Sequence, residues 1–324
     1  MPSSFSFNTG QVRSFRKRLL GWYAREQRIL PWRGETDPYR ILVSEIMLQQ
    51  TRVAVVEERY KSFIRQFPSA EKLARARLQT VLAAWSGLGY YRRARALHEA
   101  SRKIAEDGGF PRSVAELKEL PGIGQYTAAA VASIAFNQPA AVVDGNVKRV
   151  LARLTGQDLC SEDHWRLAGE LLEPRRPGDF NQAMMELGAV ICLPGKPLCE
   201  RCPVMALCAG RGREPRTAKQ AARRKAVLRY ALALEDGKVL LRRRPSDVSL
   251  MAGMWELPEY EIARGKKPLL KLRHSITTTD YTVLVYPGED EGMIGRWVSV
   301  KRAQRMALTG LAKKILRVVS RGMS

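Results

Sequence analysis

One glutamate lies within an apolar run. Glu45 falls inside the predicted helix at residues 40–50, between apolar positions 41–43 and 46–48. Apolar neighbours remove hydration from a carboxyl group, which raises its pKa and lets it hold a proton near neutral pH. A protonated carboxyl is what a general acid needs. The alternative is that Glu45 lies on the solvent side of the helix and has no chemical role.

An aspartate stands where another helix begins. Asp144 follows the apolar stretch 140–143 and precedes a helical pattern that starts at Gly145. Aspartate is a preferred N-cap, so a purely structural role is the alternative, although a cap and a catalytic group are compatible. Backbone amides and the positive helix end favour the ionised form and predict a lowered pKa. One protonated and one ionised carboxyl would suit acid-plus-stabiliser chemistry on a glycosidic bond.

Four cysteines lie within 17 residues in a C-x6-C-x2-C-x5-C pattern. They are Cys192, Cys199, Cys202 and Cys208. Such density in a reducing compartment indicates a metal or iron–sulfur site. The spacing does not choose between zinc and a [4Fe–4S] cluster, although one C-x2-C pair with long flanks is less typical of zinc. A fifth cysteine, Cys160, is interpreted as a small buried apolar residue.

The segment 120–124, Leu-Pro-Gly-Ile-Gly, lies between two helical patterns at 114–120 and 126–136. Gly122 and Gly124 allow a sharp turn and close approach to a ligand. Amides at the following helix N-terminus would then face a phosphate oxygen. The segment therefore predicts a helix-hairpin-helix that grips DNA independently of sequence, the alternative being an ordinary turn between two helices.

Composition favours a polyanionic partner. The 324 residues carry 55 Lys+Arg against 32 Asp+Glu, a formal charge of +23, which points to nucleic acid before membrane. The longest apolar stretch, 126–136, is far below the ~20 residues of a membrane span. The N-terminus lacks a signal-peptide pattern. We therefore expect a cytoplasmic, nucleoid-associated protein with reduced thiols and no membrane partner.

The elements divide the chain in two. Residues 1–208 read as helices, 209–225 as a basic linker with a charge of +6, and 226–324 as an α+β domain. Strands are predicted at 227–234, 238–243, 281–286 and 296–300. The first two flank Glu235-Asp236-Gly237 and predict a hairpin. Thr309 is predicted to cap an amphipathic helix at 310–319.

Together these features resemble adenine DNA glycosylases of the MutY type, in the helix-hairpin-helix/Gly-Pro-Asp superfamily with endonuclease III. The resemblance covers nearly the whole chain. It is carried by residues 31–33, 37–39, 44–51, 87–91, 120–128 and 143–147 and by the four cysteines. It implies a hairpin-containing six-helix subdomain at about 33–145, with the iron–sulfur subdomain formed by 1–32 and 146–208. The N-terminal helix would pack against the cluster module, and DNA would lie between the two subdomains.

The resemblance also implies chemistry. The four cysteines would bind [4Fe–4S], and a monomer would remove adenine paired with 8-oxoguanine or guanine in double-stranded DNA. Glu45 matches the general acid that protonates adenine, and Asp144 the carboxylate that stabilises or traps the sugar cation. Tyr126 and Asn146 match supporting residues. Gln50 and Tyr90 match side chains that enter the duplex, although either residue, Tyr90 above all, could be a packing residue instead.

Two positions refine this expectation. Endonuclease III carries a nucleophilic Lys two residues after the second hairpin glycine, whereas Tyr126 stands there in this chain. A phenol forms no Schiff base, so no substantial lyase activity is expected. Residues 250–258 and 297–300 resemble a C-terminal Nudix-like recognition domain without a Nudix catalytic box. In the family a Phe-Ser-His loop senses 8-oxoguanine, and it aligns here with Ile276, Thr277 and Thr278. Thr277 keeps a hydroxyl and is expected to contact DNA, but the aromatic ring and the imidazole are missing, so the preference for 8-oxoguanine over guanine stays open.

Two other functions would fit parts of this pattern. A thymine or other mismatch glycosylase could use the same scaffold, but is expected to lack an acidic residue at the position of Glu45. A non-catalytic DNA-binding protein with a structural metal would need neither Glu45 nor Asp144. The pair of carboxyls therefore favours adenine excision.

Overall fold

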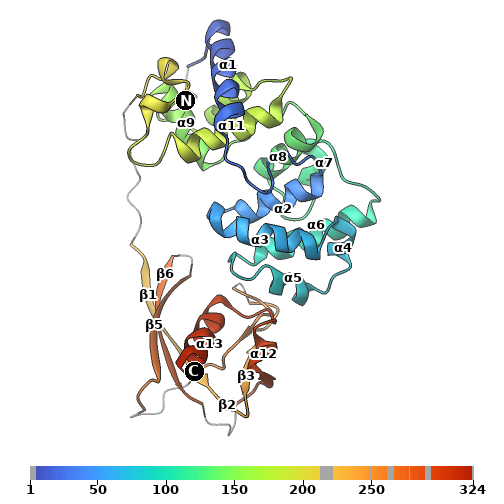
Figure 1. Cartoon of the computed structure of the whole chain (residues 1–324), viewed down its shortest axis with the longest axis vertical. Coiled ribbons are helices and arrows are strands. Elements are labelled where there is room, and N and C mark those ends of the chain that lie inside the picture. The colour runs from blue at the N-terminus through green and yellow to red at the C-terminus, as the bar shows by residue number, and fades with distance from the viewer. Residues whose placement is uncertain are drawn as a thin grey trace. The chain divides into compact units, whose positions relative to one another are not determined.

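The computed structural model describes residues 5–211, 222–248, 250–260, 266–276, 278–288 and 293–322. The chain divides into two compact units (Figure 1). The first comprises residues 1–75 and 96–218, and the second comprises 76–95 and 219–324. Most of the predicted basic linker, residues 212–221, lies outside the described residues.

The described part of the first unit is helical (Figure 1). Its long helices are α1 (Thr9–Glu26), α2 (Pro38–Leu48), α3 (Val53–Gln66), α8 (Gln125–Phe136), α9 (Gly145–Thr155), α10 (Ser161–Leu171) and α11 (Pro177–Val190). Its short ones are α4 (Ala70–Ala74), α7 (Val114–Lys118), η1 (Cys199–Arg201) and η2 (Met205–Leu207). Helix α6 (Arg92–Glu106) begins in the second unit and continues into the first.

Helix α1 packs against α10 and α11, as expected from the resemblance. Its apolar face, with Phe15 and Leu19, enters a core shared with α8, α9, α10 and α11. Cys192, Cys202 and Cys208 pack against the same core. The N-terminal helix and the cysteine segment are thus held by one continuous apolar interior.

Local signals explain where the site-bearing helices begin. Asp37 caps α2 by accepting hydrogen bonds from the amides of Tyr39 and Arg40, and Pro38 occupies the first turn. Eight of the 11 residues of α2 are buried, including Glu45. Such a helix is apolar nearly all round and can exist only inside a core. Burial of Glu45 follows from this packing.

The second unit contains α5 (Leu78–Ala84) and the C-terminal α+β region. Its strands are β1 (Arg224–Leu232), β2 (Leu234–Glu235), β3 (Lys238–Arg243), β4 (Trp255–Glu256), β5 (Leu270–Ile276), β6 (Thr279–Pro287) and β7 (Arg296–Ser299). Two helices follow, α12 (Val300–Ala303) and α13 (Gly310–Gly322). Within the described residues, one sheet has the order β1-β6-β5, and in the other β3 pairs with β2, β4 and β7.

The strand prediction for 227–234 is right in type but wrong in pairing. Asp236 and Gly237 do form a turn, but only the short β2 pairs with β3 across it. The long β1 runs parallel to β6 instead, from Arg224 opposite Thr279 to Leu232 opposite Pro287. A local turn signal sets the register of its nearest residues, whereas a parallel partner is chosen by side-chain packing far along the chain. Strand β5 has no counterpart among the predicted strands.

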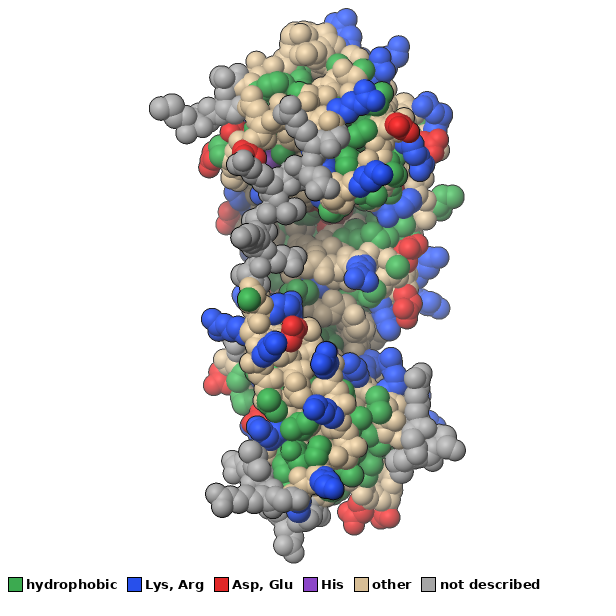
Figure 2. All heavy atoms as spheres, turned by 90° about the vertical axis from the view of Figure 1, so that its left-hand side faces the viewer, with side chains coloured by type: hydrophobic (Ala, Val, Ile, Leu, Met, Phe, Trp, Pro, Cys, Tyr) green, Lys and Arg blue, Asp and Glu red, His purple; other side chains and the backbone are tan. Residues whose placement is uncertain are grey.

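Basic side chains spread over the surface. On the face shown in Figure 2, Lys and Arg side chains outnumber those of Asp and Glu. This agrees with the net charge of +23. Among the described residues, no helix has the length and apolar character of a membrane span.

Candidate active site

Glu45 is a buried carboxyl held by a tyrosine. Its side chain is 5% exposed, and the hydroxyl of Tyr126 donates a hydrogen bond of 2.7 Å to Oε2. Burial raises the pKa of Glu45, while the Tyr126 hydrogen bond and the charge of Arg33 act in the lowering direction. A charge on Asp144 raises this pKa further. The predicted raised pKa is confirmed, and solvent exposure of Glu45 is excluded.

Asp144 is the N-cap of α9, as predicted. Its Oδ1 accepts a hydrogen bond of 2.7 Å from the amide of Val147, and its Oδ2 accepts one of 3.1 Å from Nδ2 of Asn146. The predicted lowering of its pKa is wrong. Burial raises the pKa of Asp144, and the opposing hydrogen bonds from Val147 and Asn146 do not overcome it. Desolvation depends on how tertiary packing covers the cap, which a local helix signal does not reveal.

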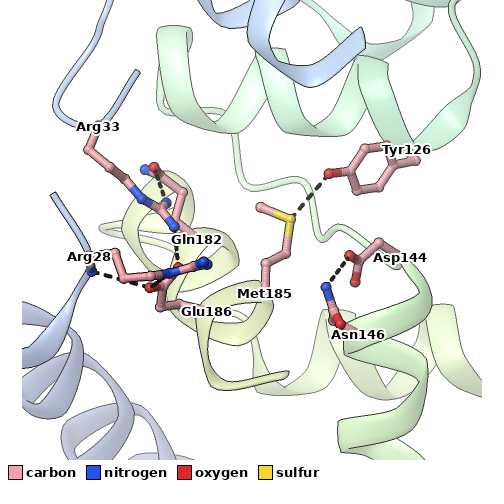
Figure 3. Close-up of polar contacts among 8 residues, drawn as sticks. All are labelled: Arg28, Arg33, Tyr126, Asp144, Asn146, Gln182, Met185 and Glu186. Carbon is pink, nitrogen blue, oxygen red and sulfur yellow. Dashed lines mark hydrogen bonds and ion pairs between the residues drawn. The ribbon is translucent and has the colours of Figure 1, made fainter. Parts of the chain in front are cut away.

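Tyr126 lies close to both carboxyl groups. Figure 3 shows its hydroxyl directed toward the Sδ of Met185, and Asp144 beside Asn146 at the start of a neighbouring helix. The hydroxyl lies 3.2 Å from Met185 Sδ in addition to its bond with Glu45. Burial and then the charges of Glu45 and Asp144 raise the pKa of Tyr126 well above its ordinary value. The phenol therefore stays protonated and remains a donor to Glu45.

The hairpin at 120–124 connects α7 to α8. Gly122 has φ +72°, and a Cβ there would lie 2.4 Å from the Cβ of Ala96, so only glycine fits. Gly124 is the N-cap of α8 and has open space around it. As a glycine, this N-cap residue makes no side-chain hydrogen bond to the amides of the first turn of α8. Backbone amides at such an exposed helix N-terminus can bind a phosphate oxygen.

The two predicted wedge residues share an unusual backbone conformation. Gln50 has φ +54° in the first unit, and Tyr90 has φ +45° in the second. Both are exposed, Tyr90 by 48% of its surface. The guanidinium of Arg93 lies 5.4 Å from the Tyr90 ring centre. A left-handed backbone conformation costs free energy at any residue other than glycine. Residues in this conformation are found most often at functional positions.

A charged cluster beside the site was not predicted. Glu186 on α11 is 1% exposed in its side chain and binds Arg28 at 2.6 Å and Arg33 at 2.6 Å. Arg33 also donates 2.6 Å to Gln182, and all four side chains lie near Met185 in Figure 3. Like Glu45, Glu186 stands in an apolar run, at Met184–Met185 and Leu187. The apolar run could have identified Glu186 as a buried carboxyl. Its arginine partners could not be found in this way, because they are more than 150 residues away in the sequence.

Replacing Glu186 with Gln is expected to destabilise the fold. Burial acts to raise the pKa of Glu186, but the Arg28 hydrogen bond and the Arg33 and Arg28 charges outweigh it, so the pKa is lowered. Removing one partner of a buried ion pair costs ~3–5 kcal/mol, and the lower end applies because Arg28 is 37% exposed. Urea unfolding at neutral pH measures this loss. The stabilisation is present above the ordinary Glu pKa and disappears as the pH falls through the lowered one.

The matched control is Glu170→Gln on α10. Glu170 pairs with Arg166, and both side chains are about one-third exposed. An exposed pair contributes ~0.2–1 kcal/mol. Equal losses in the two variants would contradict a structural role for the buried cluster.

The four predicted cysteine ligands line one pocket. Its walls include Val150, Leu187 and Ile191 together with Cys192, Cys199, Cys202 and Cys208. In the described part of the chain, no three His, Cys, Asp or Glu side chains are grouped closely enough for a single metal ion. Burial raises the pKa of the Cys202 thiol to about 11. Four sulfur donors around an apolar pocket are ligands suited to zinc or to an iron–sulfur cluster.

Cys160 does not have the predicted environment. It is exposed, and its thiol lies 3.0 Å from Oδ2 of Asp163 at the start of α10. The interpretation as a buried apolar residue is wrong. The residue takes the N-cap position of α10, and a side chain at a helix end is buried only where another segment packs over it.

The loop aligned with the recognition triplet lies between two paired strands. Ile276 ends β5 opposite Thr279, the first residue of β6. Thr278 is described, and its carbonyl accepts a 3.0 Å hydrogen bond from the amide of Arg224. Thr277, the residue expected to contact DNA, lies outside the described residues.

Fold and site define a helix-hairpin-helix protein in which Tyr126 lies near a buried carboxyl, Glu45, and a partly buried one, Asp144. A family model described as "HhH-GPD superfamily base excision DNA repair protein" matches residues 43–174. The structure of a thermostable thymine-DNA glycosylase is 33% identical with a TM-score of 0.59, covering 62% of this chain and 96% of that one. The chain therefore belongs to the HhH-GPD superfamily of base excision DNA repair proteins.

The chain is also similar to an adenine DNA glycosylase and to endonuclease III. The adenine DNA glycosylase of Mus musculus is 48% identical over 224 residues. The match covers 64% of this chain, and the chain spans only 44% of the mouse protein. An endonuclease III–DNA complex, 23% identical with a TM-score of 0.55, covers 63% of this chain and 97% of its own, and shows the shared fold of the helical region.

Proposed function

We propose that this protein is a monofunctional DNA glycosylase that removes adenine mispaired with 8-oxoguanine or guanine. The observation that carries the proposal is that Tyr126 donates a hydrogen bond to the buried Glu45 and lies near the partly buried Asp144, whose charge acts on its hydroxyl. The similarity to the mouse adenine DNA glycosylase supports the choice of base.

The two carboxyls divide the chemistry. Burial and a single hydrogen bond leave Glu45 protonated more readily than Asp144, whose carboxylate accepts bonds from Val147 and Asn146. Glu45 gives its proton to a ring nitrogen of adenine as the N-glycosidic bond breaks, so adenine leaves neutral. Ionised Asp144 stabilises the positive charge that develops on the sugar. Water then adds there and gives its proton to the Glu45 carboxylate, which restores the acid.

Tyr126 and Asn146 are positioning residues in this scheme. Tyr126 orients Glu45 through its 2.7 Å hydrogen bond. Asn146 fixes Oδ2 of Asp144 at 3.1 Å. Because Tyr126 stands where a bifunctional relative has a nucleophilic lysine, the sugar is not attacked by an amine and no substantial β-lyase activity follows.

DNA must be distorted for this reaction. The glycosidic bond of a stacked adenine is out of reach, so the nucleotide is extruded from the duplex. Gly122 and Gly124 expose backbone amides to a phosphate, while Gln50 and Tyr90 fill the space left in the stack. The strained backbone at both wedge positions supports this role. Thr277 is proposed to contact the base opposite adenine.

We propose that the four cysteines hold a [4Fe–4S] cluster with a structural role. It would complete the subdomain formed by residues 1–32 and 146–208, with the catalytic subdomain at about 33–145. The region 226–324 is proposed to be a Nudix-like recognition domain. We also propose that the protein is a monomer. Its proposed location is the cytoplasm, in association with the nucleoid.

Base release from defined duplexes tests the function. Single-turnover rates are compared for A opposite 8-oxoguanine, A opposite G and T opposite G. Adenine release without strand cleavage is expected. The thymine-DNA glycosylase relative makes thymine excision the second candidate. Thymine release without adenine release would overturn the proposal, and binding without any release would favour a non-catalytic DNA-binding protein.

A further inference from the structure

Arg153 connects the two ends of the cysteine segment. It lies in the last turn of α9 and is 5% exposed. Its Nη1 donates hydrogen bonds to the Sγ of Cys192, at 3.3 Å, and to the carbonyl of Leu193, at 2.7 Å. Its Nη2 donates a hydrogen bond of 3.0 Å to the carbonyl of Gly195. These bonds fix both the first cysteine and the chain that leaves it.

The backbone of the same residue binds the other end. The Arg153 carbonyl accepts 2.8 Å from the amide of Gly210, two residues after Cys208. A Cβ at Gly210 would lie 2.4 Å from that oxygen, so the chain can approach this closely only with glycine. One residue of α9 thus holds the positions of the first and fourth cysteines.

Among the residues that the structure describes, no carboxylate forms a salt bridge with Arg153. Within the described residues, neither Arg153 nor Arg149 makes a salt bridge, although Arg149 donates 2.7 Å to the carbonyl of Cys192. A buried unpaired charge is costly. Cysteine thiolates around an iron–sulfur core carry net negative charge, which these two guanidinium groups would offset.

We propose that Arg153 is a positioning residue that holds Cys192 toward the cluster and raises the reduction potential of the cluster. The proposal rests on the [4Fe–4S] cofactor proposed above. A hydrogen bond to a ligand sulfur and a nearby positive charge both stabilise the more reduced, more negative state of a cluster. Arg153 therefore protects the cluster against one-electron oxidation.

Arg153→Met in the full-length protein tests this. The reduction potential is measured by voltammetry without DNA, and iron per chain is counted before and after exposure to an oxidant. We expect a shift of the potential to more negative values and faster loss of iron. The matched control is Lys148→Met, which removes one positive charge from an exposed position of the same helix. Its potential is expected to stay close to that of the unchanged protein.

The outcomes separate the two proposals. If the protein without substitutions holds clearly fewer than about four iron atoms per chain, the proposed [4Fe–4S] cofactor is wrong. An iron-loaded Arg153→Met protein with an unaltered potential would overturn the role of Arg153, as would equal shifts in both variants. If Arg153→Met loses its iron during purification, Arg153→Gln, which keeps a donor without the charge, is measured instead. A more negative potential then supports the proposal, and an unchanged one refutes it.

Discussion

Glu45→Gln is expected to reduce adenine excision by ~10²–10⁴-fold, the range of a lost general acid. Gln has nearly the same shape and still accepts the Tyr126 hydrogen bond. DNA binding should therefore persist while proton transfer to the base disappears. Single-turnover base release and a filter-binding or anisotropy titration on the same duplex measure the two effects separately.

The pH profile adds a second readout for Glu45. Only the protonated carboxyl is an acid, so excision falls as the pH rises through its pKa. Because burial raises this pKa, the fall is expected at higher pH than for an ordinary carboxyl. The limb should be absent in the residual activity of Glu45→Gln. Glu58→Gln, at a side chain 71% exposed on α3, is the matched control and should keep both rate and profile. Full activity in Glu45→Gln would refute the acid assignment.

Asp144→Asn is expected to reduce excision by ~10²–10³-fold, the usual effect of removing one electrostatic stabiliser of a transition state. Asparagine is as good an N-cap as aspartate, so α9 should keep its start. The raised pKa of Asp144 means that its ionised form costs folding stability above the ordinary carboxyl pKa. The variant should therefore unfold at a slightly higher temperature at neutral pH, while activity falls.

The control for Asp144→Asn is the same change at another N-cap. Asp37 caps α2 through the amides of Tyr39 and Arg40. Asp37→Asn should leave excision within a few-fold of the unchanged protein, because no charge near the reacting sugar is removed. If both variants lost activity equally, the effect of Asp144 would be structural. Thermal unfolding would then show equal losses of stability as well.

Local signals in the sequence were sufficient for several features. The capping role of Asp144 and the turn at Asp236-Gly237 each depend on residues within a few positions. Glu45 was identified because a buried helix is apolar on most of its faces, and a carboxylate inside it is then desolvated wherever the helix packs. The cysteine set was found from its density alone.

Other features depended on residues far apart. The pKa of Asp144 has the opposite direction from the one expected, because tertiary burial outweighed the local amides. Strand β1 found its partner in β6, some 55 positions further along the chain, rather than across the nearby turn. Glu186 meets Arg28 and Arg33 from more than 150 positions away.

The amino-acid sequence by itself determined which groups are present and which helices carry them: two acids in apolar surroundings, a glycine hairpin and four thiols. Only the tertiary structure decided how far each acid is desolvated, that Tyr126 contacts Glu45, and that Arg153 reaches Cys192. The physical reason is the distance along the chain over which each interaction acts. Caps and turns act over a few residues, whereas desolvation and charge pairing depend on every segment that packs against a group.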